Sequence, residues 1–212
     1  MKIITLLAQK GGTGKTTLSI HLAVLAAARN LKVVIADIDP QQSTTFWNER
    51  RTDSAPGVMP MTASTLKQNI SKLSNQGVNL LVIDTAPHSH EDAIIAAQVA
   101  DFILIPTRPA ILDLQAIGSS VKIVKSIDGK AAIVLNGCPF PGKNGERAIV
   151  REAREALAGY GIPLASAAIS NRVALSHSLI DGKAVTEFES EGKAAEEIRE
   201  LMNWINQEAS LW

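Results

Sequence analysis

Cysteine is nearly absent from this sequence: Cys138 is the single one among 212 residues. One thiol cannot build an internal disulfide framework, a zinc site made of cysteines alone, or a cluster held by several thiolates of one chain. An excess of charge of one sign is also missing, because 21 lysines and arginines balance 21 aspartates and glutamates. This balance argues against a protein that coats nucleic acid by bulk charge, although it leaves room for a local basic patch.

Long hydrophobic runs are missing as well. The apolar stretches fall short of a membrane span, and the first residues lead into glycines rather than into a cleavage site, so we expect a cytoplasmic protein. Hydrophobic residues make up 46% of the chain and charged residues 20%, which excludes disordered and collagen-like classes. The length suits one core of good size and no linker is evident, so we predict a single domain over residues 1–212.

Short, continuously apolar runs alternate with longer segments of helical periodicity. The runs predict strands at 3–8, 32–37, 79–84, 101–106 and 131–136, with a further short one near 164–169. Such runs are typical of strands buried on both faces. Helices are expected over 16–29, 114–124, 146–157 and 198–205, and loops over 51–61 and 139–145. The alternation predicts an α/β fold, a doubly wound and mostly parallel sheet with helices on both faces and right-handed crossovers.

A glycine-rich segment joins the first predicted strand to the first predicted helix, and it reads Lys10-Gly11-Gly12-Thr13-Gly14-Lys15-Thr16-Thr17. Glycines let successive backbone N–H groups point at one centre, and the start of a helix adds partial positive charge there. Lys15 can reach the β- and γ-phosphates of a nucleotide, and the Thr16 hydroxyl can ligate Mg²⁺. Thr17 is expected at the α-phosphate. The segment therefore predicts a phosphate-binding loop, whereas glycines alone would leave an unliganded turn equally open.

The additional lysine before the double glycine makes this loop resemble the deviant Walker A motif of the ParA/MinD family of P-loop ATPases. The resemblance implies ATP as the nucleotide, slow intrinsic hydrolysis, and an ATP-bound homodimer in which Lys10 reaches the partner's phosphates. A lysine donated in this way acts like an arginine finger. A solvated lysine beside the loop is the plainer interpretation.

Acidic residues end the second and third predicted strands, where an open α/β sheet meets its ligand. The second continues as Asp37-Ile38-Asp39-Pro40-Gln41, and side chains two apart share one face, so both carboxylates could face the phosphates. The resemblance implies that Asp39 positions or activates the attacking water, and that Asp37 reaches Mg²⁺ through water. Asp84 ends an apolar strand as in a Walker B motif and is expected to hold Mg²⁺. Ala86 replaces a proline that is frequent in the family.

The resemblance also implies where the adenine lies. In related ATPases the loops after the fourth and fifth strands hold the base, which points here to Pro106, Arg108 and Asn136. A strand-end turn without ligand contact remains the alternative. Choosing ATP over GTP depends on the resemblance alone.

The resemblance extends over nearly the whole chain, and residues 179–198 look like the tail of small partition ParA proteins without an N-terminal DNA-reading domain. It implies plasmid or chromosome partition: ATP-dependent, sequence-independent DNA binding on the nucleoid, and hydrolysis stimulated by a ParB-like centromere-binding partner. Arg172, Lys183 and Lys193 are the candidate DNA contacts, and each could equally be a solvated surface charge.

Three other roles are alternatives to partition. A MinD-like membrane role is disfavoured because the final helix is acidic and anionic lipid repels an acidic face. The acidic residues are Glu196, Glu197, Glu200 and Glu208. The apolar stripe of the same helix is interpreted as a face that packs in the core, and it consists of Ile198, Leu201, Met202 and Ile205. An iron–sulfur reductase would need two cysteines per chain. A ParA-like ATPase that positions another cargo, such as a division site, a transfer complex or a secretion complex, stays open.

Overall fold

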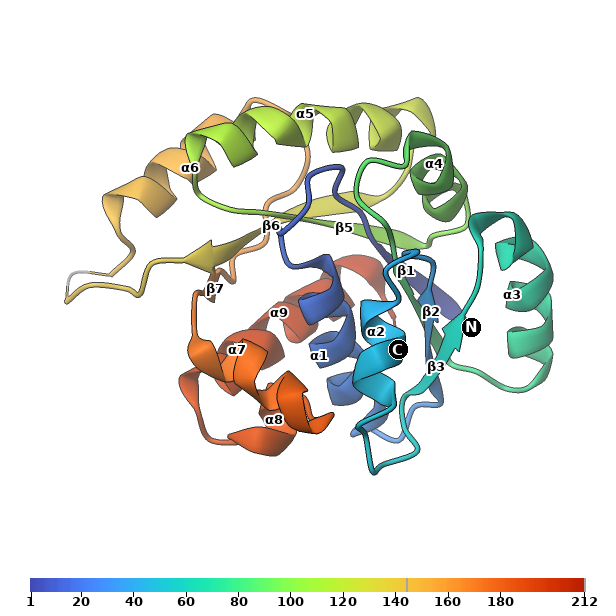
Figure 1. Ribbon diagram of the computed structural model, residues 1–212. Helices are drawn as coiled ribbons and strands as arrows, with labels where there is room; N and C mark the ends of the chain where they lie inside the picture. Colours follow the sequence, from blue (N-terminus) through green and yellow to red (C-terminus); the bar gives the residue numbers. More distant parts are fainter. Residues whose placement is uncertain (144, 212) are drawn as a thin grey trace.

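A computed structural model describes residues 1–143 and 145–211 of the chain (Figure 1). Its centre is a seven-stranded sheet in the order β3-β2-β4-β1-β5-β6-β7, and every pairing is parallel. The strands are β1 (Lys2–Leu6), β2 (Val33–Asp37), β3 (Gly57–Pro60), β4 (Leu80–Asp84), β5 (Phe102–Thr107), β6 (Ala131–Cys138) and β7 (Ile169–Ser170). The predicted α/β class and its parallel sheet are confirmed.

Helices cover both faces of this sheet (Figure 1). One face carries α1 (Lys15–Ala27), α2 (Ser43–Asn48), α7 (Val173–His177), the 3-10 helix η2 (Ser178–Asp181), α8 (Val185–Phe188) and α9 (Lys193–Ala209). The other carries the 3-10 helix η1 (Ala63–Thr65), α3 (Leu66–Asn75), α4 (His90–Gln98), α5 (Ile111–Ser126) and α6 (Ala148–Ala158). Period-two alternation directs the side chains of β1 to opposite faces: Ile4 and Leu6 lie in the core with α1 and α9, whereas Ile3 lies on the other face with α3 and α4.

The burial of two helices, α1 and α9, was predicted correctly from the sequence. The helix α1 is apolar nearly all round and is buried from Leu18 to Ala26. The stripe of α9 is buried in the core beside α1, as a core-packing face should be. Within the described residues, none of the helices combines the length and the hydrophobicity that crossing a bilayer requires.

Two predicted boundaries were wrong. The expected loop over 51–61 contains β3, which tolerates Pro60 because it lies at the edge of the sheet, where a missing N–H breaks no ladder. The strand near 164–169 consists of Ile169 and Ser170 alone, with Leu164 joined to Ile133 by an isolated bridge. Because β6 and β7 are also parallel, their carboxyl ends lie at the same edge of the sheet as those of β1, β2 and β4.

Candidate functional site

The phosphate-binding loop leaves the carboxyl end of β1 and enters α1 at Lys15. Gly12 and Gly14 have φ of +73° and +98°, a backbone region that L side chains rarely adopt. The loop therefore needs glycine at both positions to turn sharply into the helix. Because the first N–H groups of a helix have no partner within it, the turn presents donors to an anion at this end of α1.

Asn136, at the far end of β6, fastens this loop from the side. Its Nδ2 donates to the Thr13 carbonyl oxygen at 2.7 Å, and a Cβ built on Gly14 would lie 2.0 Å from the same nitrogen. Asn136 was predicted to contact adenine. The structure gives it a hydrogen bond to the phosphate loop, while it also lines the larger of the two cavities described next.

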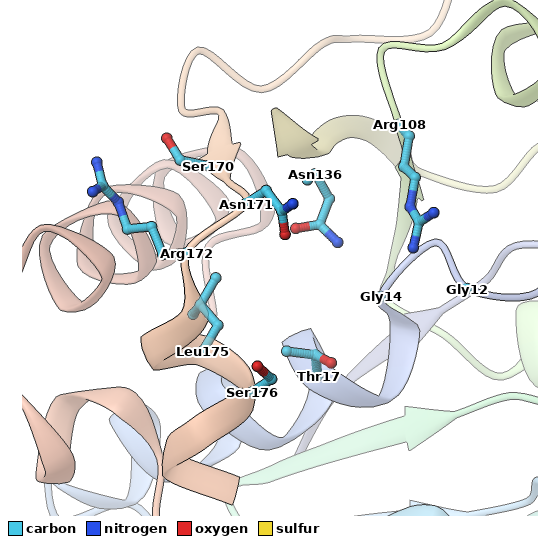
Figure 2. A pocket seen from close by; sticks show the side chains of 11 residues that line it. Gly12, Gly14, Thr17, Arg108, Asn136, Ser170, Asn171, Arg172, Leu175 and Ser176 are labelled. Atoms are coloured by element: carbon cyan, nitrogen blue, oxygen red, sulfur yellow. The ribbon is translucent and has the colours of Figure 1, made fainter. Parts of the chain in front are cut away.

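Two cavities adjoin the loop and share Gly12, Gly14 and Thr17, and Figure 2 shows the larger of the two. The smaller, of about 220 Å³, is lined by the loop together with Asp39 and Pro87. The larger, of about 450 Å³, extends from the loop to the segment after β7. A triphosphate tail suits the first and a nucleoside the second, since the donors of the loop lie between them.

Lys15 is buried at the base of the smaller cavity. Burial lowers the pKa of its ammonium, and the charges of Asp84 and Asp39 act in the opposite direction. A bound phosphate would add negative charge beside Lys15 and so favour its protonated form. That Lys15 reaches the β- and γ-phosphates stays a prediction.

Asp84 ends β4 and is completely buried. Its carboxylate accepts hydrogen bonds from the Thr44 hydroxyl at 2.8 Å and the Ser19 hydroxyl at 3.3 Å. Burial raises the pKa of Asp84 to about 6, against the effect of the Thr16 and Thr44 hydroxyls. Carboxylate and hydroxyl oxygens are the donors that Mg²⁺ takes, and Thr16 and Asp84 supply them beside the phosphate cavity. The described residues contain no group of three His, Cys, Asp or Glu side chains fit to cage a metal, and Mg²⁺ usually relies on substrate phosphates for part of its shell.

The two carboxylates at the carboxyl end of β2, Asp37 and Asp39, take different positions. Asp37 is buried beside Asp84, its register partner in the sheet, and accepts hydrogen bonds from the Thr45 N–H and hydroxyl, both at 2.9 Å. It thereby holds the start of α2. Asp39 lines the smaller cavity and accepts a hydrogen bond from the Gln41 N–H at 2.9 Å. Of the pair, Asp39 is the carboxylate that faces the phosphate site.

Lys10 makes a contact that the sequence did not reveal. Its Nζ lies 2.9 Å from Oδ2 of Asp113, with side-chain exposures of 36% and 10%. Asp113 belongs to the first turn of α5, where a negative charge is favourable next to the positive end of the helix. In this protomer the lysine predicted to reach a partner is paired within its own chain.

The two other residues predicted to contact the adenine, Arg108 and Pro106, lie in different places. Arg108 lines the larger cavity, and its side chain lies beside both Gly12 and Gly137, so it bridges the phosphate loop and the end of β6. Pro106 lies inside β5, buried and paired with Val134, rather than in a loop. It lines neither of these two cavities. The strand ends at Thr107, one residue later than predicted, so the turn that faces the cavity begins at Arg108.

Two of the three predicted DNA contacts are paired within the chain. The Arg172 guanidinium donates to Glu197 at 2.8 and 3.0 Å, and Lys193 lies 2.8 Å from Glu196 on the surface. Lys183 is exposed between η2 and α8. His88 and His90 are both exposed, and His90 begins α4.

Comparison with known proteins identifies the family. The model of the CobQ/CobB/MinD/ParA nucleotide binding domain matches residues 4–185. The "Maintenance of carboxysome distribution protein A" of Gloeobacter kilaueensis is 32% identical over 202 residues, which cover 92% of this chain and 88% of that protein.

Two solved structures share the fold. One is the ATP complex of a Cyanothece McdA variant, with a TM-score of 0.80, 16% identity, and coverage of 97% of this chain and 95% of that one. The other is a Borrelia burgdorferi protein described as acting in plasmid partition, bound to AMPPNP, with a TM-score of 0.70, 18% identity, and coverage of 97% and 98%. The chain belongs to the CobQ/CobB/MinD/ParA nucleotide-binding family, as an ATPase of its ParA/MinD branch with the deviant phosphate loop.

Proposed function

We propose that this ATPase positions a large intracellular cargo, using ATP binding to form a homodimer and hydrolysis to separate it. The observation that carries the proposal is the 32% identity with a carboxysome-distribution protein over 92% of the chain. A likeness of that extent includes the segments around both cavities, so it bears on the work of the whole chain and not on the phosphate loop alone.

The described residues supply the parts that hydrolysis needs. Lys15 and the loop N–H groups would bind the phosphates, and Thr16 and Asp84 would hold Mg²⁺, which would supply positive charge against the negative charge that develops on the phosphates. Asp39 orients a water toward the γ-phosphorus and accepts its proton as the new P–O bond forms and the bond to the ADP oxygen breaks. Asp37 would support Asp39 indirectly, because its hydrogen bond with the Thr45 N–H fixes the start of α2 close to Asp39.

The dimer is supported by where the apolar surface lies. Exposed fractions above one half occur, among large hydrophobic residues of the described chain, at Phe46, Ile111, Leu112, Phe140, Val173 and Ile180. All six lie in segments that follow the carboxyl ends of β2, β5, β6 and β7, which a parallel sheet brings to one edge. Exposed apolar side chains gathered at the edge of the sheet where a ligand would bind indicate a surface that contacts another protein. A second copy placed there would cover them and receive Lys10 at its phosphates.

We propose that the cargo moves along DNA, which this protein binds independently of sequence. On the protein, the exposed Lys183 would contact the DNA phosphates, and Lys193 would do so once its surface ion pair with Glu196 opens. Hydrolysis would be stimulated by a partner carried on the cargo. Partition of a plasmid or chromosome, with a ParB-like partner, is the second candidate, favoured by the resemblance of residues 179–198 to partition proteins.

The test combines light scattering with a DNA-binding assay, in Mg²⁺ with ATP, ADP or no nucleotide. We expect dimers and DNA binding with ATP alone, a longer-lived dimer for Asp39→Ala, and binding that weakens as salt rises. A monomer under every condition would contradict the switch. In the source cell, deletion should cluster the cargo while replicons are inherited normally; loss of a replicon with evenly spaced cargo would favour partition instead.

A further inference from the structure

The far wall of the larger cavity is a short segment with little structure of its own. It runs from Ser170, the last residue of the two-residue strand β7, to Ser176 in the five-residue helix α7. Its backbone is tied to β6 by the Asn171 N–H, which donates to the Cys138 carbonyl oxygen at 2.8 Å. An edge strand of this length cannot fix the wall by its ladder alone, so its position depends on neighbouring side chains.

One side chain of α9 provides that support. Glu197 accepts hydrogen bonds from the Ser170 N–H at 2.9 Å and the Ser170 hydroxyl at 2.8 Å. It also accepts two from Arg172, from Nε at 3.0 Å and Nη2 at 2.8 Å. Both carboxylate oxygens are used, and the Glu197 side chain is 13% exposed. Bonds of this charged kind are the stronger ones, and they meet at both ends of the Ser170–Arg172 turn.

Arg172 is held on its second side as well. Its guanidinium carbon lies 5.0 Å from the centroid of the Phe140 ring, which comes from the loop after β6. Figure 2 shows the Arg172 side chain pointing away from α1, whereas the Asn171 side chain points toward Asn136 across the cavity. Both residues line the cavity: Asn171 points toward Asn136, while Arg172 is held on the side of Glu197 and Phe140, and together they set the shape of the wall that a nucleoside would meet.

We infer that Glu197 is a positioning residue for nucleotide binding, acting through Ser170 and Arg172 on the nucleoside wall of the larger cavity. The inference rests on the proposed occupation of that cavity by the nucleoside. A neutral side chain cannot replace the carboxylate, because four donors converge on its two oxygens and an amide offers one acceptor oxygen. Glu197 is therefore distinct from its neighbour Glu196, whose pairing with Lys193 lies in solvent.

The experiment measures ATP binding and basal hydrolysis for Glu197→Ala and Glu197→Gln, with Glu196→Ala as the matched control. Binding of ATP and of inorganic tripolyphosphate is followed by calorimetry in Mg²⁺. Glu197→Ala removes all four hydrogen bonds to the wall. If the loosened wall costs ATP binding about the free energy of one charged hydrogen bond, ATP affinity should fall and KM should rise about ten-fold. The affinity for tripolyphosphate and kcat should change less than two-fold, because the phosphate loop and Asp39 are untouched.

Glu197→Gln keeps the size of the side chain and should fold, with an intermediate KM, whereas Glu196→Ala should behave as the wild type. Equal ATP affinity in wild type and folded Glu197 variants would overturn the inference, as would parallel losses for ATP and tripolyphosphate. Failure of the proposed site is recognised separately: the wild type itself would then bind ATP no more tightly than tripolyphosphate.

Discussion

The buried histidine of α1 should oppose the stabilising effect that acid has on this protein through another buried group, so that replacing the histidine makes the protein more stable on acidification. His21 is completely buried, its Nδ1 accepts a hydrogen bond from the Val185 N–H at 3.2 Å, and its Nε2 lies 3.0 Å from the Leu175 carbonyl oxygen. These partners require the neutral tautomer with hydrogen on Nε2. Protonation of Nδ1 would break the bond to Val185 and place a charge in the core.

Burial lowers the pKa of His21 from 6.5 to about 4, against smaller opposing effects of the Leu175 carbonyl and Glu187. The unfolded chain then binds a proton below pH 6.5 that the folded protein refuses until about pH 4. Stability contributed by the neutral ring is present above pH 6.5 and is lost as pH falls toward 4, by about 3 kcal/mol in full and about 2 kcal/mol between pH 7 and pH 5.

Asp84 acts in the opposite sense in the same range. Burial raises its pKa from 3.8 to about 6, so the folded protein takes up this proton first and gains about 1 kcal/mol between pH 7 and pH 5. The two effects largely cancel in the wild type without nucleotide. His21→Gln leaves the Asp84 effect alone, so the variant should become more stable on acidification.

Urea unfolding of wild type and His21→Gln at pH 7 and pH 5 tests this, with the exposed His90→Gln as the control. The stability difference between His21→Gln and wild type should shift by about 2 kcal/mol in favour of the variant at pH 5. An unchanged difference would show that His21 does not resist protonation in the fold and would refute the reasoning.

Two further predictions concern the phosphate loop and its lysine. Gly14→Ala should lower the melting temperature by several degrees more than Gly161→Ala and abolish ATP binding, because both positions have positive φ but only Gly14 has Asn136 in the way of a Cβ. Thermal melts and ATP titration check this, and equal effects of the two substitutions would contradict it. Asp113→Asn should release Lys10 and tighten the ATP-dependent dimer about two- to five-fold, a modest gain because the pair is partly exposed. Light scattering over a dilution series measures it, and a weaker dimer would mean that Asp113 supports the lysine instead of restraining it.

The parts of the fold and site that could be predicted are those encoded by neighbouring residues. Strands such as β4 are continuous apolar runs. The phosphate loop is one unbroken segment, so its glycines and Lys15 can be recognised as a phosphate-binding motif without knowing any distant contact. The order of these pieces then places Asp39 and Asp84 at one edge of a parallel sheet. Local pattern is sufficient wherever burial on both faces leaves few alternatives.

The parts that could not be predicted depend on contacts between distant residues. Pro60 reads as a strand breaker until the sheet shows that β3 is an edge. Asp113 stands 103 positions after Lys10, and its place in the first turn of a helix was the one available signal. Glu197 looked like one of several solvent-facing acids on α9, yet the turn after β7 buries it. Periodicity describes a helix face but cannot tell which segment will lie against it.

The packing of α9 against α1 has a consequence for how the protein is made. Residues of the last helix, such as Ile198 and Leu201, fill the same core as Leu22 of the first. A ribosome releases the N-terminal part first, so the nascent α1 keeps one flank uncovered until the end of the message has been translated. A chain stopped before α9 would expose that flank, so the core on this face of the sheet closes only after the last helix has been synthesised.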